Sequence, residues 1–312
     1  MHLLIPFAAP LSEAGRAAAR SLRLPRLQAL LGRLVAGARD EGQELSLSPP
    51  HERALAAALG WQGAAGCLPW AARLAQADGI ATGDLAWGLL TPAHWHVGTD
   101  QVSLADPDEL ALDDAGSREL FEAVQGLFTS EGYGLQYGAP LRWYAAHESL
   151  AALPCASLDR VIGRNVDAWL GSDPAARRIR RLQSEVQMVL YTHAANDRRQ
   201  ARGLLPVNSF WLSGCGLGQA DAPASALPPQ VDARLRRHAL GEDWAAWVKA
   251  WETLDEGPIA AALAAAEGGA AVRLTLCGER SAATFESAKQ GLLQRLRAAF
   301  IRPALPALLE AL

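Results

Sequence analysis

Lysine is nearly missing from this sequence of 312 residues: only Lys249 and Lys289 occur among 29 basic residues, and the arginines are spread along the chain. The densest basic run is RRIRR at 177–181, and the formal net charge is −4. A protein that follows the phosphates of DNA or RNA needs a broad basic surface. The composition therefore predicts that the chain has no nucleic-acid partner.

Cysteine is also scarce. The four cysteines, Cys67, Cys155, Cys215 and Cys277, lie far apart and form no C-x-x-C pair, which is typical of reduced thiols in the cytosol. No segment approaches the ~20 apolar residues of a membrane span, and the N-terminal MHLLIPFAAP lacks the basic flank of a secretory signal. We therefore expect a cytoplasmic protein that does not contact a membrane.

Strands and helices alternate towards both ends of the chain. The predicted elements are a buried strand over 3–7, helices over 12–22, from Pro25 and from Pro50, and a last strand over 271–276. A strand followed by helices that cover it is typical of the α/β class. We expect residues 1–84 and 151–312 to form a main α/β domain.

The middle of the chain has another pattern. The predicted elements are two strands within 85–104, a helix over 115–128, and short strands over 133–137 and 141–145. Strands joined by short turns indicate antiparallel pairing. Residues 85–150 are therefore predicted to form a smaller α+β subdomain.

A candidate ligand site follows the strand predicted over 207–212, which runs into the glycine-rich loop 213–218. Ligands collect where strands end in such loops, because the backbone can approach them closely there. A dinucleotide site is not expected, since no helix follows the glycines at once. The candidate ligand-binding residues are Asn208, Ser209, Gly214 and Gly216.

Two further segments carry arginines that suit an anion. In LDRVIGRNVD at 158–167, Arg160 and Arg164 with Asn165 either clamp an anionic ligand or pair with the aspartates beside them. Arg280 precedes Ser281, the predicted N-cap of a final helix. Free helix N–H groups beside an arginine suit a phosphate or carboxylate, although an ordinary strand-to-helix connection is the favoured interpretation.

Histidines suggest a metal site. His94 and His96 are two apart on a predicted strand and face the same side, with Asp100 close by. With His193 or Asp197 they could bind zinc or another divalent ion. The favoured alternative is that Trp95 faces the core and both histidines face solvent. For His193, near the end of a helix predicted over 173–197 with Asp173 as N-cap, a structural capping role is favoured.

Four blocks of the sequence together resemble one known family. They are LLIPFAAP at the start, LDRVIGRNVDAWL from 158, RRLQSEVQMVLYTH from 180, and LLPVNSFWLSGCG at 204–216. These blocks are similar to the RpfE-type regulatory proteins of proteobacteria, whose members are often labelled phosphoglycerate-mutase-like. The resemblance implies kinship with the cofactor-independent phosphoglycerate mutases and the alkaline-phosphatase superfamily. It therefore implies a central, mostly parallel sheet with helices on both faces.

The same resemblance implies a lost metal centre. In the catalytic relatives the first strand ends in a metal-binding aspartate, and here Phe7, Ala8 and Ala9 follow that strand. The last strand shows Cys277 and Glu279 where an Asp-His pair is expected. Phosphoryl transfer between two metals needs several carboxylates and imidazoles at fixed positions. The implied protein is a regulatory pseudoenzyme without a cofactor, which binds a small phosphorylated or carboxylate ligand.

Two alternatives stay open. The chain could be an active phosphoglycerate mutase or phosphatase that uses manganese or zinc at a relocated site of His94, His96, Asp100 and His193. It could also bind a protein partner through a tryptophan stripe on the predicted helix over 244–251. The spacing of those tryptophans is more typical of a helix core, which is the favoured interpretation.

Overall fold

The computed structural model describes residues 1–171, 174–222, 229–287 and 305–312. Three predictions lie outside this range: the N-cap role of Asp173, most of the loop at 221–230, and the body of the final helix beyond residue 287. The chain folds into two compact units, Met1–Trp61 with Asp221–Leu312, and Gln62–Ala220. None of the described helices is long and apolar enough to cross a bilayer.

The first unit contains a five-stranded sheet in the order β2-β11-β10-β1-β9. Its strands are β1 (His2–Ile5), β2 (Val35–Glu41), β9 (Pro229–Val231), β10 (Arg273–Cys277) and β11 (Ser281–Glu286). Its helices are α1 (Glu13–Ser21), α2 (Pro25–Leu31), α3 (Pro50–Leu59), α9 (Arg236–Leu240), α10 (Trp244–Leu254), the π-helix η4 (Asp255–Ile259), α11 (Ala260–Glu267) and α13 (Leu305–Glu310). The predicted α/β class is confirmed, but the sheet is mixed: β1 pairs in parallel with β9 and β10, whereas β11 is antiparallel to β10 and β2.

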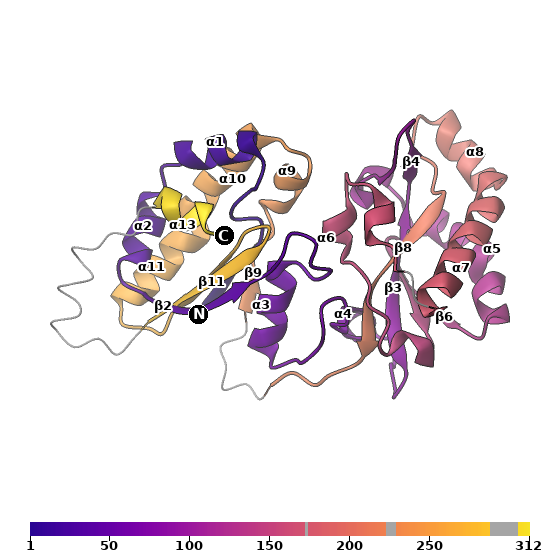
Figure 1. Cartoon of the computed structure of the whole chain (residues 1–312), viewed down its shortest axis with the longest axis horizontal. Helices are drawn as coiled ribbons and strands as arrows, with labels where there is room; N and C mark the ends of the chain where they lie inside the picture. Colours follow the sequence, from indigo (N-terminus) through magenta and orange to yellow (C-terminus); the bar gives the residue numbers. More distant parts are fainter. Residues whose placement is uncertain (172–173, 223–228, 288–304) are drawn as a thin grey trace. The chain divides into compact units, whose positions relative to one another are not determined.

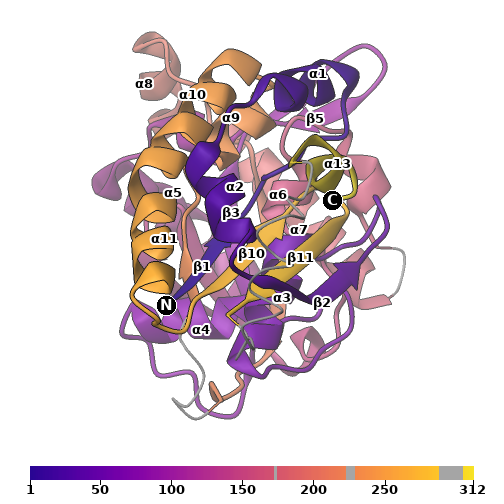
Figure 2. The same ribbon diagram turned by 90° about the vertical axis from the view of Figure 1, so that its left-hand side faces the viewer.

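Helices cover both faces of this sheet. Leu3 and Ile5 face a core that is shared with α1, α2, α10 and α11, and Leu4 faces α3. Figure 1 shows α10 and α11 on one side of β11 and α3 on the other, and Figure 2 shows α2 in front of β1. Trp247 and Trp251 are fully buried in the first of these cores, so the tryptophan stripe of α10 is helix core, as the favoured interpretation had it.

The second unit contains a four-stranded antiparallel sheet in the order β6-β7-β3-β8 and a separate β4-β5 hairpin. Its strands are β3 (Ala86–Ala93), β4 (Trp95–Val97), β5 (Val102–Leu104), β6 (Gly134–Ala139), β7 (Arg142–Ala146) and β8 (Ser209–Leu217). Its helices are α4 (Trp70–Ala77), η1 (Pro107–Leu110), α5 (Asp114–Ser130), η2 (Glu148–Leu150), α6 (Leu158–Val161), η3 (Val166–Trp169), α7 (Pro174–Tyr191) and α8 (Ala194–Ala201).

The limits of this unit differ from the expected subdomain of 85–150. β3 pairs with β7 on one side and with β8 on the other. Strand β8 therefore completes the sheet of the middle region, and it brings the segment that precedes it, including α7, into the same unit. Helices α5 and α7 pack on one face of the sheet, and α4 packs on the other.

Candidate functional site

The glycines after residue 212 do not form a loop. β8 runs through them to Leu217, and its pairing with β3 shifts register between Trp87 and Leu89, which is the mark of a β-bulge. Gly214 has a φ of 64° and Gly216 one of 153°, values that glycine adopts without strain. The predicted glycine-rich loop is wrong, because these residues form a bulge inside a strand.

Close packing accounts for both glycines. A Cβ on Gly214 would lie 2.9 Å from the backbone nitrogen of Ala71, and one on Gly216 would lie 3.1 Å from Cβ of Pro69. Pro69 and Ala71 belong to the start of α4. The glycines therefore let this helix approach β8, and the space beside them is filled by protein atoms.

The two polar candidates before the bulge, Asn208 and Ser209, differ in their hydrogen bonds, and a ligand role for them stays a prediction. Asn208 Oδ1 accepts a hydrogen bond from the N–H of Trp95 at 2.7 Å, and its Nδ2 donates to the Trp95 carbonyl at 2.9 Å. Ser209 is fully buried, and its hydroxyl has no hydrogen-bond partner among the described residues. Asn208 thus links the start of β8 to β4 through two hydrogen bonds.

Neither arginine of the segment 158–167 is fully exposed. Arg160, on the short helix α6, is only 3% exposed. Asn165 Oδ1 accepts a hydrogen bond from the N–H of Asp167 at 3.1 Å and caps η3. Arg164, which lies between Arg160 and Asn165 in the sequence, is half-buried. A ligand role for these residues stays a prediction.

Arg280 lies in the first unit, whereas the other candidate residues lie in the second. Ser281 begins strand β11 rather than a helix, and the Gly278 N–H donates to the Ser281 carbonyl at 2.9 Å across the turn. The predicted anion site at a helix N-terminus is therefore wrong. The alternating pattern of SAATFE explains the strand, since Ala283 and Phe285 face the main core and Ala282 faces α3.

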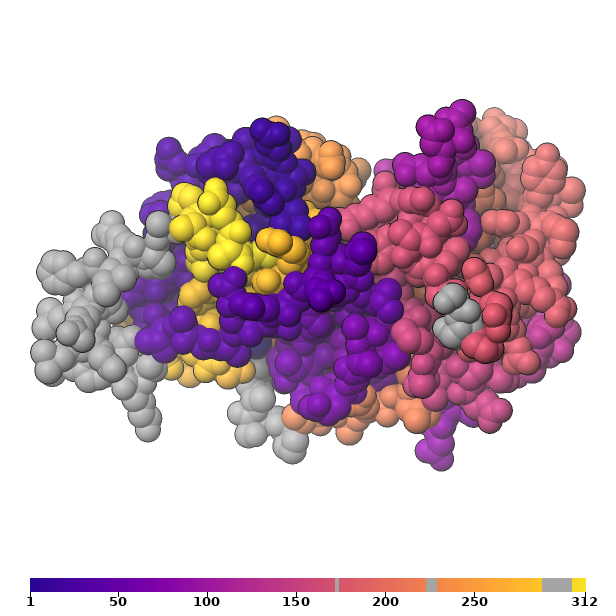
Figure 3. Space-filling view, in the orientation of Figure 1, coloured from indigo at the N-terminus to yellow at the C-terminus, as the bar shows by residue number. Residues whose placement is uncertain are grey.

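The paired histidines sit at the start of the β4-β5 hairpin. His94 Nδ1 lies 2.9 Å from the carbonyl oxygen of Pro206, and the His94 and His96 rings are 6.5 Å apart between centroids. His96 and Asp100 are exposed on this hairpin, which projects from the second unit in the space-filling view (Figure 3).

His193 has a different position from the one expected. The helix predicted over 173–197 is two helices, α7 and α8, and His193 lies between them. Its Nδ1 accepts a hydrogen bond from the N–H of Ala195 at 3.3 Å and so caps the start of α8. Within the described residues, no group of three or more His, Cys, Asp and Glu side chains is arranged to hold a metal ion.

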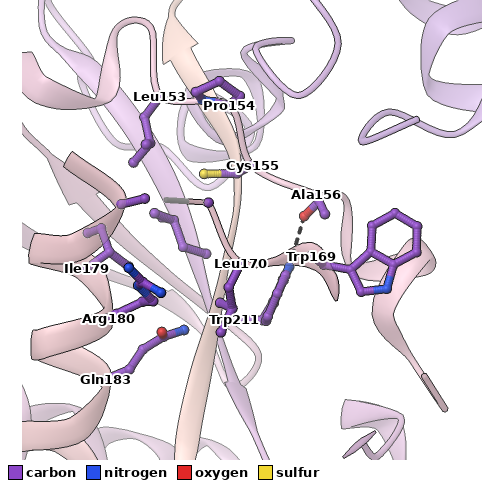
Figure 4. Close-up of a pocket in the computed structure, with 13 residues that line it drawn as sticks. Leu153, Pro154, Cys155, Ala156, Trp169, Leu170, Ile179, Arg180, Gln183 and Trp211 are labelled. Carbon is purple, nitrogen blue, oxygen red and sulfur yellow. Dashed lines mark hydrogen bonds between the residues drawn. The ribbon is translucent and has the colours of Figure 1, made fainter. Parts of the chain in front are cut away.

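A pocket open to solvent lies elsewhere in the second unit, between α7, β8 and two connecting segments (Figure 4); its empty space, open solvent included, is about 370 Å³. Its lining residues are Leu153, Pro154, Cys155, Ala156, Trp169, Leu170, Gly171, Ala176, Ile179, Arg180, Gln183, Trp211 and Leu212. The walls are mostly apolar, which suits a ligand with an apolar body.

Helix α7 supplies one wall of the cavity through residues at positions i, i+3, i+4 and i+7. These are Ala176, Ile179, Arg180 and Gln183, which share one side of an α-helix. Figure 4 shows the Arg180 guanidinium and the Gln183 amide on the side that faces Trp211. Gln183 Nε2 donates to the Phe210 carbonyl at 3.1 Å, and this bond fixes the amide at the cavity wall.

Arg180 gives the cavity its charge. Of the lining residues that the structure describes, it is the one charged side chain, and it forms no ion pair with another described residue. Its neighbours on the helix, Arg178 and Arg181, both pair with Glu131. The cavity therefore combines apolar walls with a cation that has charge to offer a ligand.

The opposite wall is held in place by a tryptophan. Trp211 Nε1 donates to the carbonyl oxygen of Ala156 at 2.9 Å, the bond drawn dashed in Figure 4. This bond ties the segment 153–156 to β8. Trp211 belongs to the strand predicted over 207–212, whereas Arg180 and Gln183 were not predicted to be site residues. The i, i+3, i+4, i+7 spacing on a helix with an apolar stripe was the available signal.

Comparisons with known proteins give a distant structural likeness. No protein-family model matches the sequence, and the curated proteins contain no significant match to it. The chain is similar in structure to the cofactor-independent phosphoglycerate mutase from Thermoplasma acidophilum DSM 1728, with 15% identity, 99% of each chain covered and a TM-score of 0.37. It is also similar to the PH0037 protein from Pyrococcus horikoshii, with 14% identity, 99% of this chain and 97% of that chain covered, and a TM-score of 0.45. At these values the likeness carries no argument about activity.

Proposed function

We propose that the chain is a regulatory binding protein whose second unit takes a small anionic ligand with an apolar body. The ligand lies in the cavity between α7 and β8, with its apolar part against Ile179 and Trp211 and its anionic group on Arg180. The observation that carries this proposal is the single described cation at the edge of an otherwise apolar cavity. Pockets of this composition are the usual sites of small ligands in proteins.

The chemistry of the anion follows from the guanidinium. Arg180 is a planar donor with several N–H groups, which match a carboxylate or a phosphate in pairs. Apolar walls lower the local dielectric constant and strengthen the attraction between unlike charges. A carboxylate suits this lining better than a phosphoester with several polar groups, because 11 of the 13 lining residues offer no charged or amide side chain.

The regulatory part of the proposal rests on the sequence. The blocks at 158–170 and 204–216 resemble the RpfE-type regulatory proteins, and Phe7, Ala8 and Ala9 follow the first strand where related enzymes carry a metal-binding aspartate. We propose on this basis that the chain does not transfer phosphoryl groups between two metals. A cytoplasmic location, expected from the dispersed cysteines, is part of the same proposal.

A titration with a matched pair of small molecules tests the ligand class. We expect 3-phenylpropionate to bind the full chain in a calorimeter and its neutral amide, 3-phenylpropanamide, to bind less tightly. Arg180→Gln should weaken carboxylate binding about tenfold to a hundredfold, since a hydrogen bond to a charged group contributes ~1.5–3 kcal/mol, and it should leave amide binding nearly unchanged.

The control variant is Arg177→Gln. Arg177 is an exposed arginine on the same helix that does not line the cavity. The Arg177→Gln substitution removes the same charge and should leave the affinities for the carboxylate and for the amide unchanged. Equal losses in the two variants would mean that the helix attracts anions through its total charge, and the proposed site would then be wrong.

A further inference from the structure

Three of the four cysteines, which are far apart in the sequence, gather in the second unit beside the cavity. Cys155 Sγ lies 3.6 Å from Cys215 Sγ. The N–H of Cys155 donates to the carbonyl of Gly66 at 3.0 Å, which brings the neighbouring Cys67 to the same place. Cysteine spacing does not reveal this cluster, because no C-x-x-C pair is present and the three residues come from different segments.

The two closer thiols differ in access and in their freedom to move. Cys215 is fully buried in β8. Cys155 is half-buried, lines the cavity and lies in a segment outside any helix or strand. A solvent molecule that enters the cavity therefore meets Cys155, whereas Cys215 lies behind it as the second thiol of the pair.

We propose that Cys155 and Cys215 form a site of reversible oxidation, in which a peroxide converts the two thiols into a disulfide. The sulfur atoms must approach by about 1.5 Å from 3.6 Å to the disulfide bond length of about 2.05 Å. Rotation of Cys155 within its irregular segment supplies most of this movement. Cys215 lies between the two glycines of the bulge, Gly214 and Gly216, and stays in place in strand β8 while Cys155 moves.

The reaction proceeds in two balanced steps. The Cys155 thiolate attacks one peroxide oxygen, the O–O bond breaks, and the leaving hydroxide takes up a proton to give water and Cys155 sulfenic acid. The Cys215 sulfur then attacks the sulfenic sulfur, the S–O bond breaks, and the hydroxyl leaves as water with the proton of Cys215. In total two thiols and one peroxide give one disulfide and two waters.

The surroundings favour Cys215 as the second thiol to react. The hydrogen bond with Cys155, burial and the nearby thiols together raise the pKa of Cys215. Burial, and to a lesser extent Cys155, also raise the pKa of Cys67. Cys215 is therefore protonated at neutral pH, and it gives up its proton only when it attacks the oxidised Cys155.

Oxidation also changes the wall of the cavity. Cys155 lies next to Ala156, whose carbonyl receives the hydrogen bond from Trp211. A disulfide that draws Cys155 towards β8 shifts this wall. We expect the oxidised protein to bind 3-phenylpropionate more weakly than the reduced protein. This consequence rests on the proposed function, whereas the disulfide itself does not.

Mass spectrometry of the full chain after brief treatment with hydrogen peroxide tests the pair. The wild type should lose the mass of two hydrogen atoms, give a crosslinked peptide that contains Cys155 and Cys215, and regain its mass with dithiothreitol. Cys215→Ser should instead accumulate a sulfenic acid on Cys155 that dimedone captures. Cys67→Ser serves as the control and should form the same crosslink as the wild type.

Two results would overturn this inference. One is a crosslink between Cys67 and Cys155 in place of the proposed pair, and the other is oxidation of Cys155 to a sulfinic acid in the wild type without any crosslink. Ligand titration of the reduced and oxidised proteins separates this inference from the proposed function. If the crosslink forms but neither the reduced nor the oxidised protein binds a carboxylate, the proposed function is wrong and the disulfide site stands.

Discussion

Gly214 and Ala71 lie so close that a methyl group on the glycine would stand 2.9 Å from the backbone nitrogen of the alanine. The glycine also has a φ of 64°, which strains any residue with a Cβ. Strand β8 and helix α4 therefore depend on the absence of a side chain at this position. This contact gives Gly214 a structural role, and a ligand-binding role for it stays a prediction.

Gly214→Ala should destabilise the protein by about 1–3 kcal/mol, because it combines backbone strain with a clash against backbone atoms. Urea unfolding measures the change. Gly126→Ala is the control: Gly126 lies on the exposed side of α5, and a Cβ there would meet nothing within 4 Å. That variant should gain about 0.5–1 kcal/mol from helix propensity. Equal effects in both would contradict the packing role of Gly214.

Asn208→Ala should cost about 1–3 kcal/mol of unfolding free energy, because it leaves the N–H and carbonyl of Trp95 without their side-chain partner. Chemical denaturation of the variant measures this cost. The affinity for 3-phenylpropionate should stay unchanged, since Asn208 does not line the cavity. If the variant keeps normal stability but no longer binds the ligand, Asn208 is a ligand-binding residue and this prediction is wrong.

His193→Ala should lower stability by about 1 kcal/mol through loss of the cap on α8. His193→Asn should keep most of the stability, because asparagine is among the best N-caps, and thermal unfolding of the two variants makes the comparison.

Elemental analysis of the double variant His94→Ala with His96→Ala tests the relocated metal site. Equal zinc and manganese contents in this double variant and in the wild type are expected, and a stoichiometric metal lost from the variant would revive the relocated metal site.

Asp78 gives the stability a pH dependence. Its carboxylate accepts hydrogen bonds from Arg142 Nε at 2.9 Å and Nη2 at 2.8 Å, and from the Tyr144 hydroxyl at 2.6 Å. The bonds from Arg142 are the main cause that lowers the pKa of Asp78 in the folded protein; burial opposes this effect and Tyr144 adds to it. A carboxylate with a lowered pKa stabilises the fold above its unfolded pKa of about 3.9, and the contribution is lost as the pH falls through the folded pKa.

Urea unfolding of Asp78→Asn at several pH values tests this dependence. The wild type should exceed the variant in stability at neutral pH, and the difference should shrink below about pH 4. Asp84→Asn is the control, since Asp84 is exposed and makes no hydrogen bond within the described residues. A difference that stays constant with pH would mean that the Asp78 charge has no part in stability.

The sequence predicted the local elements better than their assembly. The helices predicted over 12–22, from Pro50 and over 115–128 are confirmed as α1, α3 and α5, because capping residues, prolines and apolar spacing act within a few residues. β11 was mistaken for the start of a helix, because the strand is defined by its pairing with β10. The six residues of β11 alone do not indicate that pairing. Short strands carry little local preference of their own.

The candidate site was harder to predict, because it depends on pairings across the chain. The register of β3 against β8 puts Gly214 and Gly216 into a bulge, and Trp211 of the same strand lines the cavity together with residues of α7. Arg180 looked like one of several arginines on a solvated helix until that packing placed it at a cavity. A single sequence contains no local signal for such a pairing, and the same holds for the contact between Cys155 and Cys215.

A crystal structure of the chain grown with 3-phenylpropionate tests the central claim most directly, because it shows where an apolar carboxylate lies. The account predicts the phenyl ring between Ile179 and Trp211, with the carboxylate within salt-bridge distance of Arg180. A carboxylate bound instead at Arg280, or at His96 on the β4-β5 hairpin, with the cavity empty would contradict it.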